Sequence, residues 1–578
     1  MRIRKILSVL LVLSVIVPSA VIGVFGEGSF VIEDGILAEY KGTDTDVVIP
    51  DGVTAIGEKA FFSNKTVKKV TLPEGVTSIG ASAFEGCENL SDVNVPSSVT
   101  EIQDSAFKDC VSLVVITLPD SVTFLGAGAF EGCVNLSEII LSKGLTAISE
   151  STFFSCQKLT SVDIPDGVKT IGAEAFRDCQ RLTEVNFGEG LLEIGFRAFY
   201  SCYSIYEVAL PNTVEVIGDY AFDACGNITT VVIPDSLRDM GDRPFSNCFA
   251  LNEFITSAQC EKYVAIDGIL FSKDGRELVQ YPSGRDSDSY DVPGGVEKIG
   301  NYAFGWALPL ARVNISSSVT EIGEGAFFDC DNLLWAGLHD KITSIGKDAF
   351  RSCDSLKTVE LPTSITSLSD GLFFECKSLK DVSIPDTVAE IGKDVFRSCT
   401  SLVTVKIPDG VTKLGASAFA FCSSLAEIIL PSGITSIEAQ LFQDCDSLVD
   451  IVIPEGVTSI GDEAFRSCDM LVSITVPDSL TEIGKEVFYG CTSLSRVEGS
   501  VDLGLTFGDS SESPETTEEA AASSEEETTV AVTETEIGTD EKKDDGRGPM
   551  FIIGVIVGAV VGFGAVGVII LVRKQSKK

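Results

Sequence analysis

The sequence predicts a mainly β solenoid, and two regularities lead to this fold class. A phenylalanine recurs every 23 residues in two unbroken runs, and sixteen of these eighteen phenylalanines are followed three residues later by cysteine. Self-similarity at a fixed period of this size is typical of coils that stack on their neighbours. Because solenoids present surfaces rather than clefts, we expect a binding function. The two runs are Phe61, Phe84, Phe107, Phe130, Phe153, Phe176, Phe199, Phe222 and Phe245, then Phe304, Phe327, Phe350, Phe373, Phe396, Phe419, Phe442, Phe465 and Phe488.

Each repeat contains two extended segments and one turn-like segment. In the copy that begins at Cys87, a Leu-x-x-Val-x-Val segment alternates toward its end as a half-buried strand does, and Pro96 ends it. The next segment is short and rich in β-branched residues, which favours a second, shorter strand or an extended turn. The Ala-Phe-x-x-Cys segment is too short for a stable helix, so we expect one helical turn there. The predicted coil therefore joins parallel strands by short helical turns.

A single repeat of this kind cannot be stable by itself. About seven buried apolar side chains at ~1.5–3 kcal/mol each stabilise it by on the order of 10–20 kcal/mol. Ordering the backbone of its 23 residues costs on the order of 1–2 kcal/mol per residue. Stacking of coils, with hydrogen bonds between them, is what makes the array stable.

The two phenylalanine runs predict two arrays of nine repeats, residues 48–256 and 293–508. The first array follows residues 27–47, where two apolar segments surround Asp34-Gly35, a strong hairpin signal. Exposed sheet edges invite unwanted pairing, so a β cap at this end has a physical purpose. Alternating apolar residues from Val501 to Phe507 predict a last strand that seals the other end.

Residues 257–292 separate the two arrays and are predicted to form a β insert. Val264–Leu270 repeats the pattern of Val31–Leu37 at five of seven positions. A further Asp-Gly pair, Asp274-Gly275, indicates a third strand and thus a three-stranded meander. The second array is therefore expected to begin with its own cap.

The two ends of the chain predict a single-pass membrane protein. Residues 1–26 carry an early basic cluster and an apolar run, typical of a secretory signal peptide. Residues 550–572 contain no charge and are long enough for one transmembrane helix. The basic residues of the tail 573–578 favour a cytoplasmic location for it, with the repeats outside the cell.

Two further features concern the membrane-proximal part. Residues 509–549 are acidic and rich in Ser, Thr and Glu, so we expect a disordered stalk. Gly554, Gly558 and Gly562 lie four residues apart in the apolar segment and predict a weak helix-mediated dimer. The alternative reading of these glycines is the general abundance of glycine in membrane helices.

The recurrent cysteines are expected to be a structural ladder. Neighbouring coils lie about 4.8 Å apart, and parallel side chains at that spacing resist the convergence of Cβ atoms that a disulfide needs. A buried reduced cysteine is a good small hydrophobe; disulfides between coils are the alternative in an exported protein. Cys260 lies outside the ladder and is expected to be a free, reactive thiol. The expected core includes Phe84, Phe107, Phe130, Phe176, Phe350, Phe396, Phe465, Cys87, Cys110, Cys179, Cys353 and Cys468.

Composition argues against several function classes. The formal net charge is −42, from 85 acidic and 43 basic residues, which disfavours nucleic acid and anionic lipid as partners of the repeats. The single histidine, His339, stands in a slot otherwise filled by proline, and no cluster of cysteine and histidine completes a zinc site. Paired carboxylates are abundant, but on an open sheet they lack the burial that a general acid needs. We therefore expect no enzyme activity, no cofactor and no metal.

The repeat resembles the leucine-rich repeat superfamily, in particular its 23-residue BspA-like subclass of bacterial surface proteins. The resemblance rests on strings such as Ile164–Gly172, with Ala175-Phe176 and Cys179 following in register. It implies a curved coil with a parallel sheet on its concave face. It also implies attachment to host proteins or to other cells, which makes an extracellular protein or cell-surface ligand the expected partner. The alternative is a structural spacer of the cell envelope without a specific ligand.

Residues beside the middle valine of each strand should point out of the sheet, and many of them are acidic. This acidic row favours recognition of a basic protein patch, while solubility is the plain alternative. Arg312 and Trp335 occupy the same register in neighbouring coils, where a cation–π pair would make a binding hot spot. The structural alternative is that Trp335 folds back over Ala336 and Gly337. The acidic candidates are Asp92, Glu138, Asp163, Glu184, Glu207, Glu360, Asp381, Glu427 and Asp450.

Overall fold

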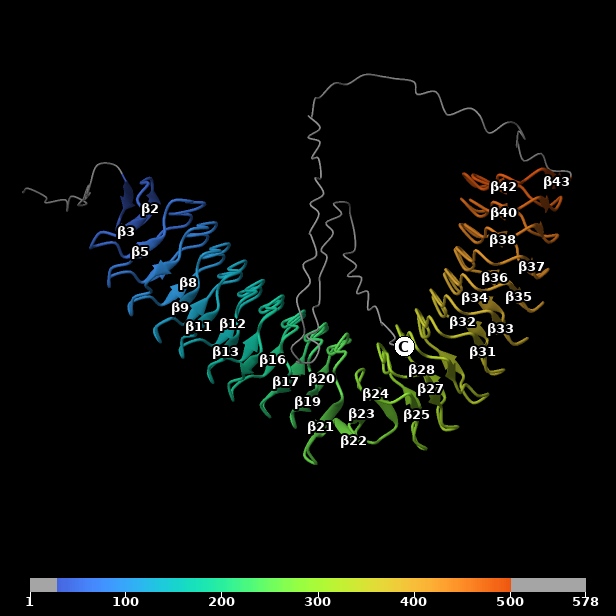
Figure 1. The fold of residues 1–578 in the computed structure, drawn as a ribbon, viewed down its shortest axis with the longest axis horizontal. Coiled ribbons are helices and arrows are strands. Elements are labelled where there is room, and N and C mark those ends of the chain that lie inside the picture. Colours follow the sequence, from blue (N-terminus) through green and yellow to red (C-terminus); the bar gives the residue numbers. More distant parts are fainter. Residues whose placement is uncertain (1–28, 500–578) are drawn as a thin grey trace, which may run out of the picture. The chain divides into compact units, whose positions relative to one another are not determined.

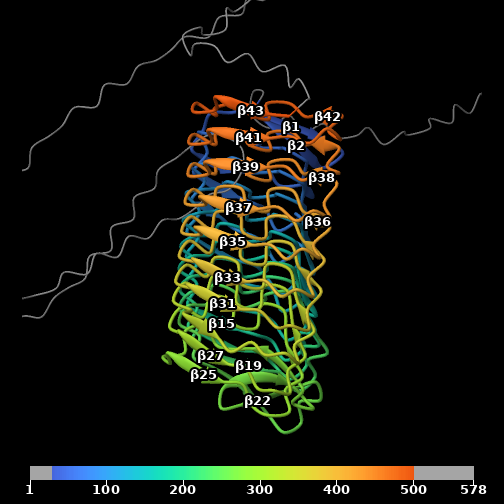
Figure 2. The same ribbon diagram turned by 90° about the vertical axis from the view of Figure 1, so that its right-hand side faces the viewer.

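The computed structural model describes residues 29–499, which form a β-solenoid (Figure 1). The coils stack in the order of the sequence, and each contributes a longer strand to one row and a shorter strand to another (Figure 2). Neighbouring strands of a row are parallel and offset by one repeat; Ser161, for example, pairs with Glu184 and Val162 with Val185. Every side chain therefore lies beside its counterpart in the next coil.

Each array has its own row of longer strands. In the first array it comprises β3 (Asp46–Val48), β5 (Lys69–Thr71), β7 (Asp92–Val93), β9 (Val115–Thr117), β11 (Glu138–Ile140), β13 (Ser161–Asp163), β15 (Glu184–Asn186), β17 (Glu207–Ala209), β19 (Thr230–Ile233) and β21 (Glu253–Thr256). In the second it comprises β25 (Ser289–Asp291), β27 (Arg312–Asn314), β29 (Trp335–Ala336), β31 (Thr358–Glu360), β33 (Asp381–Ser383), β35 (Thr404–Lys406), β37 (Glu427–Ile429), β39 (Asp450–Val452), β41 (Ser473–Thr475) and β43 (Arg496–Glu498).

The shorter strands are formed by the Thr-Glu-Ile-type segments of the repeat. In the first array these are β4 (Ala55–Ile56), β6 (Ser78–Ile79), β8 (Glu101–Ile102), β10 (Phe124–Leu125), β12 (Ala147–Ile148), β14 (Thr170–Ile171), β16 (Glu193–Ile194), β18 (Val216–Ile217) and β20 (Asp239–Met240). In the second they are β26 (Lys298–Ile299), β28 (Glu321–Ile322), β30 (Ser344–Ile345), β32 (Ser367–Leu368), β34 (Glu390–Ile391), β36 (Lys413–Leu414), β38 (Ser436–Ile437), β40 (Ser459–Ile460) and β42 (Glu482–Ile483).

The repeated phenylalanines form a buried column of stacked rings. Within each array, successive ring centroids lie between 4.9 Å, for Phe61 and Phe84, and 5.7 Å, for Phe130 and Phe153. The cysteine three residues later makes the other recurrent core contact: Cys87 Sγ donates to the carbonyl oxygen of Phe61 at 3.0 Å, and later coils repeat this bond. Cysteine suits this slot because it is small, apolar and still a weak donor. The phenylalanines and cysteines expected in the core are all fully buried.

The prediction of short helical turns is wrong, since the described residues contain no helix. In the turn around Phe176, Glu174 and Asp178 have φ values of 55° and 60°, in the left-handed region, and a right-handed helix cannot pass through such residues. The N–H of Phe176 donates to Ala198 of the next coil at 2.8 Å instead of to a residue within its own turn. Each turn is therefore held by its neighbour.

We also predicted one transmembrane helix as part of the fold. This helix is not part of the fold that the described residues form. Nowhere in residues 29–499 does a helix occur with the length and hydrophobicity to cross a membrane. The predicted signal peptide (1–26), the strand near 501–507, the stalk (509–549), the apolar segment (550–572) and the tail (573–578) lie outside the described residues. The described protein is a β-solenoid alone.

Antiparallel strands occur at the start of each array. Strands β1 (Phe30–Glu33) and β2 (Ile36–Tyr40) form a hairpin, and β2 continues in parallel with β4. Strands β22 (Tyr263–Ile266), β23 (Ile269–Ser272) and β24 (Glu277–Gln280) form a meander, and β24 continues in parallel with β26.

The two arrays have separate hydrophobic cores that meet at strand β23 of the meander. Leu270 belongs to the core of the first array, whereas Ile269 and Phe271 belong to that of the second. This division follows from strand geometry, because successive side chains of a strand point to opposite faces. One strand therefore closes the end of one core and the beginning of the other.

Candidate partner-binding surface

The outer face of the longer strands, here called the long-strand face, consists of the residues that flank each buried middle residue. In β11, for example, Ile139 is buried whereas Glu138 and Ile140 are exposed. The parallel register aligns these flanking residues in two rows, one on each side of the buried column. Side chains of many coils are thus presented on one continuous strand surface.

Every acidic residue that the sequence singled out lies exposed on this face, at the strand positions given above. Asp163 accepts a hydrogen bond from Asn186 at 2.8 Å, and Asp92 pairs with Lys69 at 2.6 Å. Acidic residues outnumber basic ones in the two rows. The basic residues of the longer strands within residues 29–499 are Lys69, Arg312, Lys406 and Arg496.

Trp335 is half exposed, and the structure brings it close to Gly337 rather than to Arg312. Arg312 and Trp335 are register partners of β27 and β29, but among the cation–π contacts of residues 29–499 this pair does not occur. A Cβ atom on Gly337 would lie 2.6 Å from the indole, so the ring covers the glycine. With 47% of its surface accessible, the ring still offers a contact area to a partner.

The sequence reading missed an apolar pair on the same face. Ile429 and Val452, in neighbouring coils, are 72% and 63% exposed and line a groove of about 520 Å³. Glu427 and Asp450 lie beside them at the other flank of the same strands. The signal was present in the sequence, because both residues stand directly after the middle residue of a strand.

A second missed feature is a ladder of arginines and aromatic rings at the residue after the core phenylalanine, which occurs in some of the coils. Arg351 lies over Phe328 and Phe374, with its guanidinium carbon 5.5 and 4.2 Å from the ring centroids. Arg177 lies in the same way between Phe154 and Tyr200. Reading the residue after each phenylalanine at the repeat period reveals this alternation.

Polar and reactive groups elsewhere have structural roles. None of the seventeen cysteines forms a disulfide, and Cys260 is fully buried, so the expectation of an accessible thiol at Cys260 is wrong. His339 is partly buried, and its Nε2 lies 2.9 Å from the carbonyl oxygen of Ser316. Residues 29–499 contain no cluster of three potential metal ligands.

Comparisons with solved structures find other repeat proteins. The chain is similar to a leucine-rich cell surface protein from Faecalibacterium prausnitzii, with 24% identity, coverage of 83% of this chain and 95% of the other, and a TM-score of 0.34. A leucine-rich repeat protein from Bacteroides ovatus shares 23% identity, with coverage of 82% and 91% and a TM-score of 0.33. The pneumococcal vaccine antigen PcpA shares 16%, with coverage of 82% and 98% and a TM-score of 0.34. No curated protein sequence matches the chain.

The family itself is identified from the repeats. The model of the BspA type leucine-rich repeat region matches residues 39–160, 146–271, 285–402 and 367–495, which together span most of the chain. Repeats of this kind typically serve as scaffolds that bind proteins, not as enzymes. The chain therefore belongs to the BspA-type leucine-rich repeat family.

Proposed function

We propose that this protein recognises a protein partner at a cell surface, as an adhesion or recognition molecule whose long-strand face is the binding surface. The observation that carries the proposal is the excess of exposed carboxylates in the two aligned rows of that face. Such a surface complements a basic patch on a host or cell-surface protein and speeds its association. Display of the repeats outside the cell is part of the proposal.

The apolar residues of the face add to its binding capacity. Ile429 and Val452 supply water-exposed apolar area next to two carboxylates, and Trp335 supplies half an indole ring. Binding energy at interfaces concentrates in a few such anchors, with tryptophan prominent among them. A partner with both basic and apolar side chains fits this combination.

The proposal is tested by binding of the purified protein to an immobilised panel of extracellular-matrix and cell-surface proteins. For each partner found, affinity should fall as salt rises, because exposed charges are screened. Glu427→Lys should weaken binding by about tenfold, the equivalent of about 1.4 kcal/mol. Its matched control is Glu101→Lys, at an exposed position of the shorter-strand row. Equal losses in the two variants would place the binding surface elsewhere.

The role of the indole has its own comparison. If the ring is an anchor, Trp335→Ala should weaken binding more than tenfold, which corresponds to more than about 1.4 kcal/mol. Phe124→Ala is the matched control, because Phe124 is 48% exposed but lies in the shorter-strand row. Unchanged affinity of Trp335→Ala would show that the ring serves only to cover Gly337. Absence of any partner would favour the alternative of a structural spacer.

A further inference from the structure

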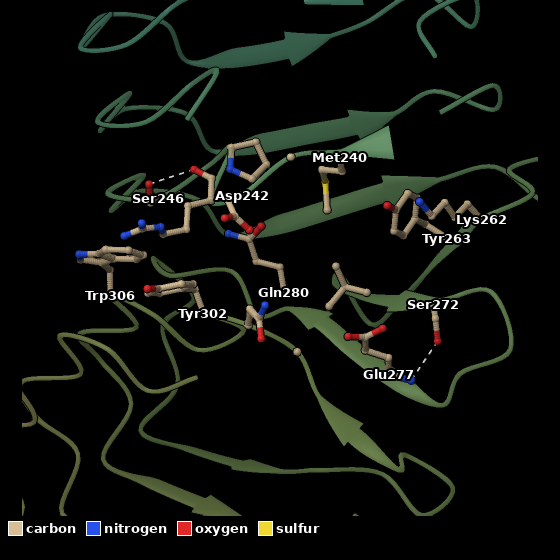
Figure 3. Close-up of a pocket in the computed structure, with 16 residues that line it drawn as sticks. Met240, Asp242, Ser246, Lys262, Tyr263, Ser272, Glu277, Gln280, Tyr302 and Trp306 are labelled. Carbon is tan, nitrogen blue, oxygen red and sulfur yellow. Dashed lines mark hydrogen bonds between the residues drawn. The ribbon is translucent and has the colours of Figure 1, made fainter. Parts of the chain in front are cut away.

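The row of shorter strands is interrupted where the two arrays meet. Strand β20 pairs with β18 on one side and ends its sheet there, and the next sheet of this row begins with the meander. A cavity of about 290 Å³ lies beside the free edge of β20, between this edge, the meander and the turn from Gly300 to Trp306 (Figure 3). One rung of the row is missing at this place.

The edge of β20 presents some of the hydrogen-bonding groups that join regular coils, although Lys262 Nζ already donates to one of them, the carbonyl of Arg238. One coil earlier, Gly241 N–H donates to Ile217 O at 2.8 Å and Asp242 N–H donates to the Asp219 carboxylate at 2.8 Å. The corresponding groups facing the cavity are the carbonyl of Met240 and the carboxylate of Asp242, and within residues 29–499 neither has such a partner. The N–H of Arg243 likewise lacks a next-coil carbonyl among the described residues.

The apolar part of the missing rung is uncovered too. Ile194 and Ile217 are fully buried because each is covered by the residue in register with it in the next coil, Ile217 and Met240 respectively. Met240 occupies the same position in the last coil and is only partly buried. Across the cavity, Leu278 is in register with Ile299 of the stack and is fully buried, whereas Val279 beside it is partly buried. An aliphatic side chain in the cavity would cover Met240 and Val279.

The backbone geometry restricts the residue that follows this aliphatic side chain. A Cβ atom on Gly218 would lie 2.8 Å from the backbone of Gly195, and one on Gly241 would lie 2.5 Å from the backbone nitrogen of Asp219. Side chains rarely approach backbone so closely, so glycine is preferred at this position. Gln103, Ser149, Ser369 and Glu438 hold it in other coils, and no regular coil of residues 29–499 has a β-branched residue there. The same preference applies to anything that takes the next place beside Gly241.

We propose that the junction cavity binds an extended peptide segment of a partner protein, which adds as a parallel strand to the free edge of β20. The segment carries an aliphatic residue followed by glycine, and its main chain supplies the N–H and C=O groups that the edge lacks. Addition of a strand to an exposed sheet edge is a general mode of peptide recognition. The position before the aliphatic residue lies in register with Asp239 and Glu277, so a neutral or basic side chain fits there.

The chain has one more copy of this motif outside the described residues, Thr535-Glu536-Ile537-Gly538. Its glutamate would take the position in register with Asp239 and Glu277, and repulsion among three carboxylates disfavours it. Charge therefore favours a segment from another protein over this one.

The test uses the full chain and intrinsic fluorescence. The protein has two tryptophans, and Trp306 lines the cavity, so in a Trp335→Phe background the fluorescence reports on the cavity alone. The probe is the acetylated and amidated hexapeptide Val-Lys-Thr-Ile-Gly-Ala, the sequence of residues 168–173. We expect a saturable change in fluorescence together with slower hydrogen exchange in residues 239–247. The peptide with valine in place of glycine should give neither.

Two variants show whether the probe binds at the edge of β20. Asp242→Ala should weaken the probe about tenfold, because it removes a charged hydrogen-bond acceptor. Asp462→Ala is the matched control, since Asp462 holds the same position in a coil of the second array, where it accepts from Lys485 N–H at 2.7 Å. Binding should be unchanged in this control.

Four results would overturn the proposal. Three are no response to the probe at millimolar concentration, equal binding of the valine peptide, and a response to neutral saccharides in place of peptides. The fourth is binding that appears only when Ile537→Asp is introduced, because the chain's own motif would then be the occupant.

Discussion

Removal of one ring from the phenylalanine column tests how far stability is shared along the solenoid. Phe176 is fully buried and stacks on Phe153 and Phe199, with both centroid distances 5.1 Å. Substitution by alanine leaves a cavity that the neighbouring coils cannot close, because cross-coil hydrogen bonds hold their spacing. Phe176 N–H donates to Ala198 O, and Phe153 N–H donates to Ala175 O, both at 2.8 Å.

The size of the effect follows from the packing. Phenylalanine-to-alanine substitutions in close-packed cores cost about 3–5 kcal/mol, including the term for the cavity left behind. The two lost ring contacts place Phe176→Ala in the upper part of this range, since each such pair contributes about 0.5–1.5 kcal/mol beyond its buried area. Coils interact mainly with their neighbours, so the damage should be local.

Hydrogen exchange of the full chain, followed by mass spectrometry, measures where protection is lost. We expect a loss in peptides from the coils of Phe153, Phe176 and Phe199, and native protection in the second array, which has its own core. Phe396→Ala is the matched control and should give the reverse pattern. Equal loss of protection in both arrays after either substitution would refute the nearest-neighbour reasoning.

Three further predictions concern the thiols, the turns and the arginine ladder. Burial raises the pKa of the Cys422 thiol from 9.0 to about 12. The ladder thiols of the native protein should therefore resist alkylation at pH 8. Mass spectrometry of the labelled protein should show the partly exposed Cys491 alkylated first. Because the unfolded thiol ionises first, the free energy of unfolding should fall as the pH rises from about 9 toward 12, in urea titrations at several pH values. Ala224 has a φ of 59°, in the left-handed region that favours glycine. Ala224→Gly should therefore be neutral or stabilise the protein by up to about 1 kcal/mol, whereas Ala221→Gly in the buried stack should destabilise it. Thermal unfolding of the two variants measures the difference. Arg351→Ala should lower the free energy of unfolding by about 1–3 kcal/mol, since the guanidinium packs between two rings. The control is Arg238→Ala at an exposed arginine, which should lower it less.

The coil and its register could be predicted because they depend on the 23-residue period of the sequence. This period can be recognised even when the local structure of a segment within the repeat is predicted wrongly. Phe176 and Cys179 lie in the core for the reason that the sequence indicated, namely an unbroken apolar slot in every repeat. The turn between the strands could not be predicted in the same way. Serine, aspartate, asparagine and glycine at the second residue after phenylalanine are suited to left-handed backbone, but the short apolar Ala-Phe pair suggested a helix.

The candidate surface was predictable in part. Acidic flanking residues could be placed on one face because strand alternation fixes which side chains point outward. The contact of Trp335 with Gly337 depends on a side-chain rotamer, which a repeat pattern does not specify. Cys260 was misjudged for a related reason, because burial in the insert depends on how the meander packs between two cores.

The division of the core at β23 has a consequence for how such chains can change in length. Each array carries its own antiparallel start, and β23 gives one side chain to the first core and two to the second. A unit made of an antiparallel cap and the array that follows can therefore be gained, lost or exchanged by recombination while the core on each side of the new joint stays closed. The number of units that are joined then sets the length of the solenoid, and the choice of units sets which side chains its outer face presents. These two properties can therefore vary independently.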